Sequence, residues 1–183
     1  TGQPLIPLGQ ATQGVGSAFA VSGDRGHLAI ATDTAAIHDV AQEAPGRELD
    51  IGETAITDLA FTAGDESVVS GDDRGDVRLW RAVTGTESRT LLDGDAAITA
   101  VATSRDGRLI AAATASSADV EVIDLEEDGA RWQISDIEAD VVDLAFEPDG
   151  AVLAVAQADG TVSLWDAVGR RSIGDVGRVD DAS

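Results

Sequence analysis

Residues 159–169 read DGTVSLWDAVG. An Asp-Gly pair, typical of tight turns that need a positive φ, precedes the alternating run TVSLW. The run ends in Trp165, and Asp166 follows it directly. Strict alternation over such a short run predicts a half-buried β-strand. The Trp-Asp pair is either the start of a site or a marker of a repeated structural unit.

The same pattern recurs along the chain with a nearly constant step. Residues 75–85, GDVRLWRAVTG, repeat the strand and its tryptophan. One series of equivalent positions, spaced by 42, 43 and 42 residues, comprises His38, Trp80, Ile123 and Trp165. A second series, spaced by 42, 42 and 43 residues, comprises Phe19, Phe61, Thr103 and Phe146. Two landmarks in phase over the whole chain indicate four structural repeats.

Each unit contains several short strands and no segment with helical periodicity. In the last unit VVDLAF alternates, AVLAVAQ forms a second run and TVSLWDA a third, with PDG and ADG as turns between them. A weaker fourth run follows the third in several units. Four strands in about 42 residues are the dimensions of one blade of a β-propeller.

The units resemble the WD-repeat β-propeller family, in which a Trp-Asp pair closes the third strand of each blade. Only Trp165-Asp166 matches the pair in full, since Arg81 follows Trp80. The Gly-His pair that the family often carries before the first strand is missing from every unit. The resemblance implies an all-β fold of four blades, each with four antiparallel strands. It assigns structural roles to Phe19, His38, Phe61, Trp80, Ile123, Phe146, Trp165 and Asp166.

The repeat phase predicts a single array of blades along residues 1–183. We expect a leading outer strand, followed by four blades, at residues 1–9, 10–53, 54–95, 96–138 and 139–183. Propellers of this family usually close with about seven blades, and four is the lower limit for any propeller. Terminal blades would leave apolar faces and strand edges in water. We therefore expect either a segment of a larger propeller or closure with a second copy.

The charge excludes several classes of partner. The chain carries 34 acidic and 12 basic residues, a net charge of -22. Such a surface repels phosphate backbones and anionic lipid headgroups, which predicts binding to neither nucleic acid nor membranes. The acids are spread along the whole chain, which favours adaptation to a salt-rich cytoplasm over one acidic binding face. Without a signal peptide or a long apolar run, a cytoplasmic location is expected.

No catalytic or metal site is expected from the reactive residues. The chain has no cysteine and two histidines, His27 and His38, which give no zinc pattern. His38 occupies the tryptophan position of its unit and is expected to be structural, whereas His27 follows a turn and is expected to be exposed. The acids of residues 71–77, GDDRGDV, do not have the spacing of a calcium loop. We expect no cofactor.

The leading hypothesis is a non-catalytic scaffold for a protein partner of unknown identity. The family resemblance implies docking on the face with the second-to-third-strand turns and the loops that enter each first strand. The exposed candidates there are Asp72, Asp73, Arg74, Asp95, Glu138, Asp140 and Asp159. Their chemistry suits a basic or polar surface. Two alternatives stay open: a sensor or enzyme that uses a central channel or inter-blade cleft, and a self-associating half-propeller.

Overall fold

Sixteen strands form four separate antiparallel sheets in the computed structural model. It describes residues 18–178 apart from 43–44, 116, 128 and 149. The leading outer strand expected at residues 1–9 lies outside the described residues. A 3-10 turn at Ala63–Asp65 is the one helical element of the described chain.

Each sheet consists of four consecutive strands, paired in sequence order. The first sheet contains β1 (Ala18–Val21), β2 (His27–Ala31), β3 (Ala35–Asp39) and β4 (Arg47–Leu49). The second sheet contains β5 (Ile56–Phe61), β6 (Ser67–Asp72), β7 (Val77–Arg81) and β8 (Glu87–Leu92). The third sheet contains β9 (Ile98–Thr103), β10 (Leu109–Thr114), β11 (Val120–Asp124) and β12 (Ala130–Ile134). The fourth sheet contains β13 (Val141–Phe146), β14 (Val152–Gln157), β15 (Thr161–Asp166) and β16 (Arg171–Arg178).

The turn residues and the strand register follow the repeat. Gly107 and Gly160, the second residues of two Asp-Gly pairs, have φ angles of 74° and 85° and close the turns as expected. The landmark residue of each third strand pairs with the same position of its second strand. These pairs are His38 with Leu28, Trp80 with Val68, Ile123 with Ile110, and Trp165 with Leu153.

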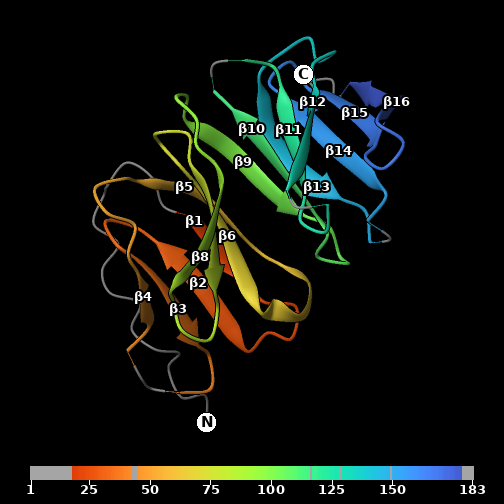
Figure 1. Cartoon of the computed structure of the whole chain (residues 1–183). Helices are drawn as coiled ribbons and strands as arrows, with labels where there is room; N and C mark the ends of the chain where they lie inside the picture. Colours follow the sequence, from red (N-terminus) through yellow and green to blue (C-terminus); the bar gives the residue numbers. More distant parts are fainter. Residues whose placement is uncertain (1–17, 43–44, 116, 128, 149, 179–183) are drawn as a thin grey trace, which may run out of the picture.

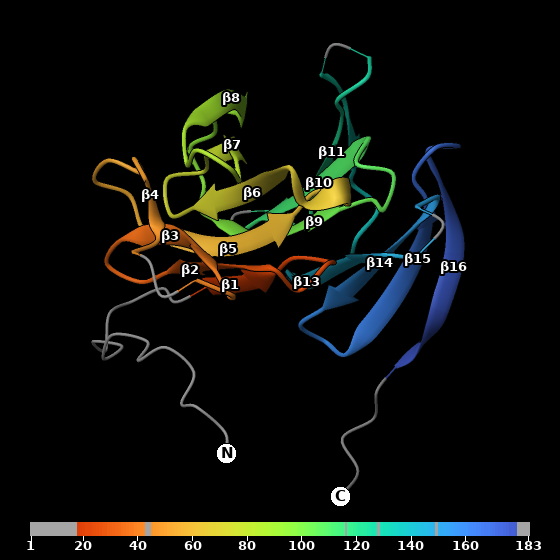
Figure 2. The ribbon, with the colours of Figure 1, turned by 90° about the horizontal axis from the view of Figure 1, so that it is seen from below.

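The four sheets follow one another in an open array (Figure 1). The first strands β1, β5, β9 and β13 contact one another in sequence order. In Figure 2 the first and the fourth sheets lie at opposite ends of the series, and the array is not closed. The expectation of an all-β, WD-type propeller with four blades of four antiparallel strands is confirmed.

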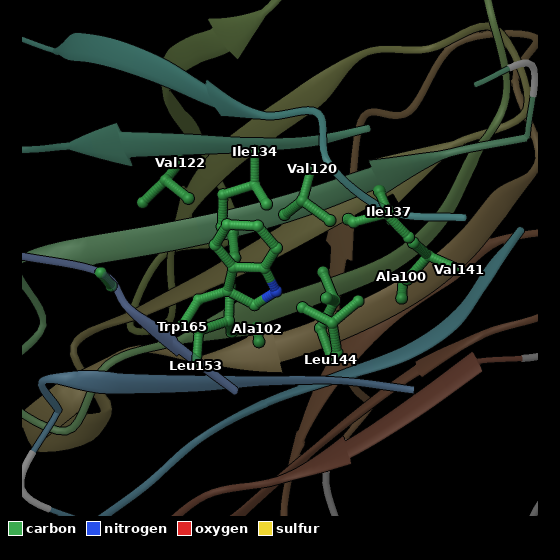
Figure 3. Close-up of a cluster of buried hydrophobic side chains, with 14 of the residues drawn as sticks. Ala100, Ala102, Val120, Val122, Ile134, Ile137, Val141, Leu144, Leu153 and Trp165 are labelled. Atoms are coloured by element: carbon green, nitrogen blue, oxygen red, sulfur yellow. The ribbon is translucent and has the colours of Figure 1, made fainter. Parts of the chain in front are cut away.

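Each sheet has two apolar faces, and the core lies between sheets. We call the face that packs on the next sheet in the sequence the forward face, and the opposite one the rear face. The forward face of the second sheet, with Val69 and Val77, packs on the rear face of the third, with Ile98 and Ile110. Equivalent apolar clusters join the first sheet to the second and the third to the fourth. In Figure 3 the Trp165 ring lies among side chains of the third sheet.

Hydrogen bonds one repeat apart in sequence also join neighbouring sheets. The Val101 N–H donates to Asp58 Oδ2 at 2.8 Å, and the Thr103 hydroxyl donates to the Phe61 carbonyl at 2.7 Å. The Gly23 and Asp24 N–H groups donate to the two oxygens of Asp65 at 2.7 and 2.9 Å. The partners are 41 to 43 positions apart, so the repeat length is built into the first two junctions.

The first sheet departs from two expectations. Phe61 and Phe146 pair with Val68 and Leu153, the partners of the third-strand landmarks, but in the first sheet Val21 holds that place opposite Leu28. Phe19, expected there from its spacing, pairs with Ile30 and is 72% exposed. Its structural assignment fails because no described sheet covers the rear face of the first sheet. The expectation that His27 is exposed is also wrong. The side chain is half-buried, and its Nδ1 is buried without a hydrogen-bond partner.

Candidate functional site: the turns at one end of the sheets

The second-to-third-strand turns and the loops into the first strands lie at one end of the sheets. Strands in each sheet run antiparallel, so the second strand ends where the first begins. The turn of the second sheet packs on the loop that enters the third. A Cβ on Gly75 would lie 2.7 Å from the Ala96 carbonyl oxygen. Candidate residues from different sheets are thus brought to the same end of the fold.

Asp72 does not lie on this surface. Its side chain is 1% exposed, so the expectation of an exposed binding residue is wrong. Its Oδ1 accepts the N–H groups of Arg74, Gly75 and Asp76 at 2.9 to 3.0 Å. A carboxylate that satisfies three backbone donors of a tight turn has to point into that turn. Asp72 therefore organises the turn.

A partly buried charge cluster supports the same turn. Arg78 Nη2 lies 2.6 Å from Asp76 Oδ2 and 3.7 Å from Asp72 Oδ2. Burial disfavours the Arg78 charge, but the two carboxylates outweigh burial and raise the pKa of the guanidinium above its ordinary value. The sequence analysis did not identify Arg78. Its position two residues after Asp76 was the only sequence signal that could have pointed to it.

The exposed part of the turn presents Asp73 and Arg74. The Ala55 N–H donates to Asp73 Oδ1 at 3.0 Å, and the Asp73 N–H donates to the Ala55 carbonyl at 2.9 Å. Arg74 Nη2 donates to the Glu53 carbonyl at 3.0 Å. Both side chains are exposed. Asp95 is exposed in the adjoining loop between Gly94 and Ala96, both of which pack on Gly75. These three candidates form one group.

The second group belongs to the fourth sheet. Gln157 takes the place of Asp72, is buried, and accepts the Ala139 N–H at 3.2 Å. The Ala158 N–H donates to the Asp140 carbonyl at 2.8 Å, which holds the entering loop on the turn. Asp159 accepts both the N–H and the hydroxyl of Thr161. Glu138, Asp140 and Asp159 are exposed. The structure thus places six candidates in two groups, with the third sheet between them.

The other end of the sheets carries the acids that follow the landmark residues. Asp166 Oδ1 accepts the Gly169 N–H at 2.7 Å, and Asp124 Oδ1 accepts the Glu126 N–H at 3.0 Å. Asp124 Oδ2 also accepts two bonds from Arg108, at 2.6 and 2.9 Å. These carboxylates close the turns that follow the third strands.

Two hollows are relevant to the sensor alternative. One, of about 110 Å³, lies between the third and fourth sheets, and the Arg170 guanidinium there stands 4.5 Å from the centre of the Trp132 ring. Small-molecule sites usually measure about 300–1,000 Å³, so this cleft offers the alternative no support. The other, of about 430 Å³, is an open depression with Glu48 and Asp50 in its lining. Among residues 18–178, as described, no three His, Asp or Glu side chains are grouped to hold a metal ion.

His38 lies at a structural place. The half-buried imidazole faces Gly46, where an added Cβ would come within 2.9 Å of Nδ1. The ring therefore packs on the backbone of the connection between β3 and β4.

No helix of the described chain is long and apolar enough to cross a bilayer.

Comparisons with known proteins agree with this geometry. The family model for the WD domain, G-beta repeat, matches residues 46–81 and 133–166. Each match ends at a landmark tryptophan and the residue after it, Arg81 or Asp166. Two of the four units are thus similar to repeats of the WD-repeat family. The chain is also 31% identical over 93 residues to the target of rapamycin complex subunit wat1 of Schizosaccharomyces pombe. That match covers 49% of this chain and 29% of the relative.

Proposed function

We propose that this chain is a non-catalytic scaffold whose partner docks on the two groups of exposed turn residues. The matched family model and the similarity to a subunit of a protein complex support a role in protein interaction. The proposed docking face rests on one observation: each loop that leads into a first strand packs on a second-to-third-strand turn. This packing holds acids from two segments in fixed positions.

The expected partner surface is basic or rich in hydrogen-bond donors. Five of the six exposed candidates are carboxylates, and Arg74 is tied to the Glu53 carbonyl. Preorganised carboxylates accept charge-assisted hydrogen bonds from arginine or lysine and steer a basic partner during its approach. The net charge of -22 strengthens this attraction at long range and adds no selectivity of its own.

A titration with a lysine- and arginine-rich peptide tests the face. Asp140→Arg removes an exposed acid whose side chain makes no hydrogen bond or ion pair within the described residues, so we expect weaker binding by about 5-fold or more. Glu66→Arg is the matched control, because Glu66 is an exposed acid next to β6 at the opposite end of the sheets. Both variants change the net charge equally. Equal weakening by the two variants, measured by fluorescence anisotropy, would assign the binding to bulk charge and overturn the docking face.

A further inference from the structure

The forward face of the fourth sheet lacks the cover that every other forward face has. The outer strands of the first three sheets place Leu49, Leu91 and Ile134 against the next sheet, at 5%, 8% and 5% exposure. Val176 occupies the equivalent place in β16, beside the register shift opposite Val162, and is 65% exposed. The forward faces thus share an apolar position that is open only at this end of the described array.

Small side chains in the second strands suit this face to a neighbour with large ones. Ala111 and Ala113 on β10 lie in the cluster that receives Trp165 and Leu153 of the next sheet. Ala154 and Ala156 hold the same two positions on β14 and are half-buried. The fourth sheet therefore presents small side chains at the two positions where the third sheet receives Trp165 and Leu153.

The rear face of the first sheet supplies the large side chains. Leu28 pairs with His38 just as Leu153 pairs with Trp165, so Leu28 and His38 belong to the rear face. Phe19 and Val21 lie on the same face of β1 and are 72% and 55% exposed. The two ends of the array are therefore complementary to each other in the same way as the faces of the three formed junctions.

An aspartate in the first strand shows the same complementarity between the two ends of the array. Asp58 Oδ1 accepts the Leu59 N–H of its own strand at 2.8 Å, and its Oδ2 accepts the Val101 N–H of the next sheet. Asp143 has the same place in β13 and accepts the Leu144 N–H at 2.8 Å. Within the described residues its second oxygen has no hydrogen-bond partner. That oxygen is in position for an N–H from the first strand of a further sheet.

We propose that two copies of this chain associate head to tail, the forward face of each fourth sheet packing on the rear face of the partner's first sheet. Within the described residues one copy leaves one face of each kind uncovered, and two copies would cover all four. The resulting ring has eight sheets, within the usual range of about four to eight blades, whereas three copies would exceed it. Closed rotational symmetry of this kind is the common form of soluble homo-oligomers. This inference is independent of the proposed docking face.

Light scattering after size-exclusion chromatography tests the ring. We expect a mass twice the chain mass of 18.7 kDa. Because association stabilises the folded chain, we expect the dimer to persist over about a hundredfold dilution. Because each chain carries a net charge of -22, we expect tighter association at about 1 M NaCl, where the Debye length falls to about 3 Å. Phe19→Glu and Val176→Glu each place a carboxylate in the junction and should weaken dimerisation by about 100-fold.

Val83→Glu is the matched control, because Val83 is 73% exposed and lies on the turn after β7, away from both faces. It should leave the dimer intact. All three positions are exposed, and circular dichroism of each variant reports whether its fold is kept. A monomer in both low and high salt would overturn the proposal. So would a dimer that survives Phe19→Glu and Val176→Glu, or an open series of higher oligomers. Peptide binding by Asp140→Arg is read separately and decides only the docking face.

Discussion

The second and fourth sheets have the same strand order and register but differ in what surrounds them. Along β6 every residue from Val68 to Asp72 is buried, because both faces of the sheet are covered. Along β14 buried and half-buried residues alternate, because only the rear face is covered. The local sequence thus determines which face a side chain joins, and the neighbouring sheet determines whether that face is buried.

The largest difference between covered and open faces is expected at the landmark position. Trp80 is fully buried, and its indole N–H donates to Ser70 Oγ at 2.8 Å. Trp80→Ala should lower the free energy of unfolding by about 3–5 kcal/mol. His38→Ala, at the same place on an open face, should lower it by about 1 kcal/mol or less. Urea unfolding in a Phe19→Glu background, which keeps association from covering His38, measures both, and equal losses would contradict the comparison.

A methyl group added to a forward face should show the next largest difference. A Cβ on Gly71 would overlap the Ile98 side chain and come 3.1 Å from Val101 Cγ1. Gly71→Ala should therefore destabilise the fold by about 1–3 kcal/mol. Ala156→Val enlarges the equivalent place in the fourth sheet and should cost about 0.5 kcal/mol or less. Thermal unfolding measures both variants in a Phe19→Glu background, which keeps association out of the measurement. A larger loss of stability from Ala156→Val than from Gly71→Ala would contradict the assignment of covered and open faces.

The smallest effect is expected at the acids that close the third-to-fourth-strand turns. The Arg108 guanidinium lowers the pKa of the buried Asp124, against the opposing effect of burial. The ionised form therefore stabilises the fold. Its contribution is complete above the ordinary pKa of 3.8 and is lost as pH falls through the lowered folded-state value.

Asp124→Asn should accordingly destabilise the fold near neutral pH, and its difference from the unsubstituted chain should shrink in acid. Asp166→Asn is the comparison at the open end. The Gly169 N–H, and to a smaller extent Arg171, lower the pKa of Asp166, but Arg171 is 76% exposed. The loss of stability caused by Asp166→Asn should therefore be smaller than that caused by Asp124→Asn. Unfolding followed from neutral pH into acid checks both; a difference for Asp124→Asn that grows in acid would contradict the assigned sign.

The sequence alone predicted the sheets well because the repeat carries several signals at once. His38 and Ile123 lack the tryptophan ring, yet their spacing placed them in register with Trp80 and Trp165. Asp-Gly turns and alternating strands marked the same unit independently. Agreement between period, turn chemistry and strand pattern made the architecture predictable without a complete family motif.

The burial of single residues was harder to predict. Asp72 and Asp73 are adjacent acids in one turn, but the first caps the turn from inside and the second faces solvent. Their chemical identity is the same, so only the backbone path distinguishes them. Phe19 matches Phe61 by its spacing, but the register gives that place to Val21, and the exposure of Phe19 depends on whether a sheet precedes it. Such differences arise from neighbours that a local pattern does not encode.

The bonds from Val101 to Asp58 and from Thr103 to Phe61 connect the third unit to the equivalent place in the second. If a gene loses or duplicates one complete unit, the sheets that become neighbours in the encoded protein already have matching faces. Loss of a single codon inside a strand instead displaces every later side chain in that strand to the opposite face. This architecture can change its length in whole units with little repair at the new boundary.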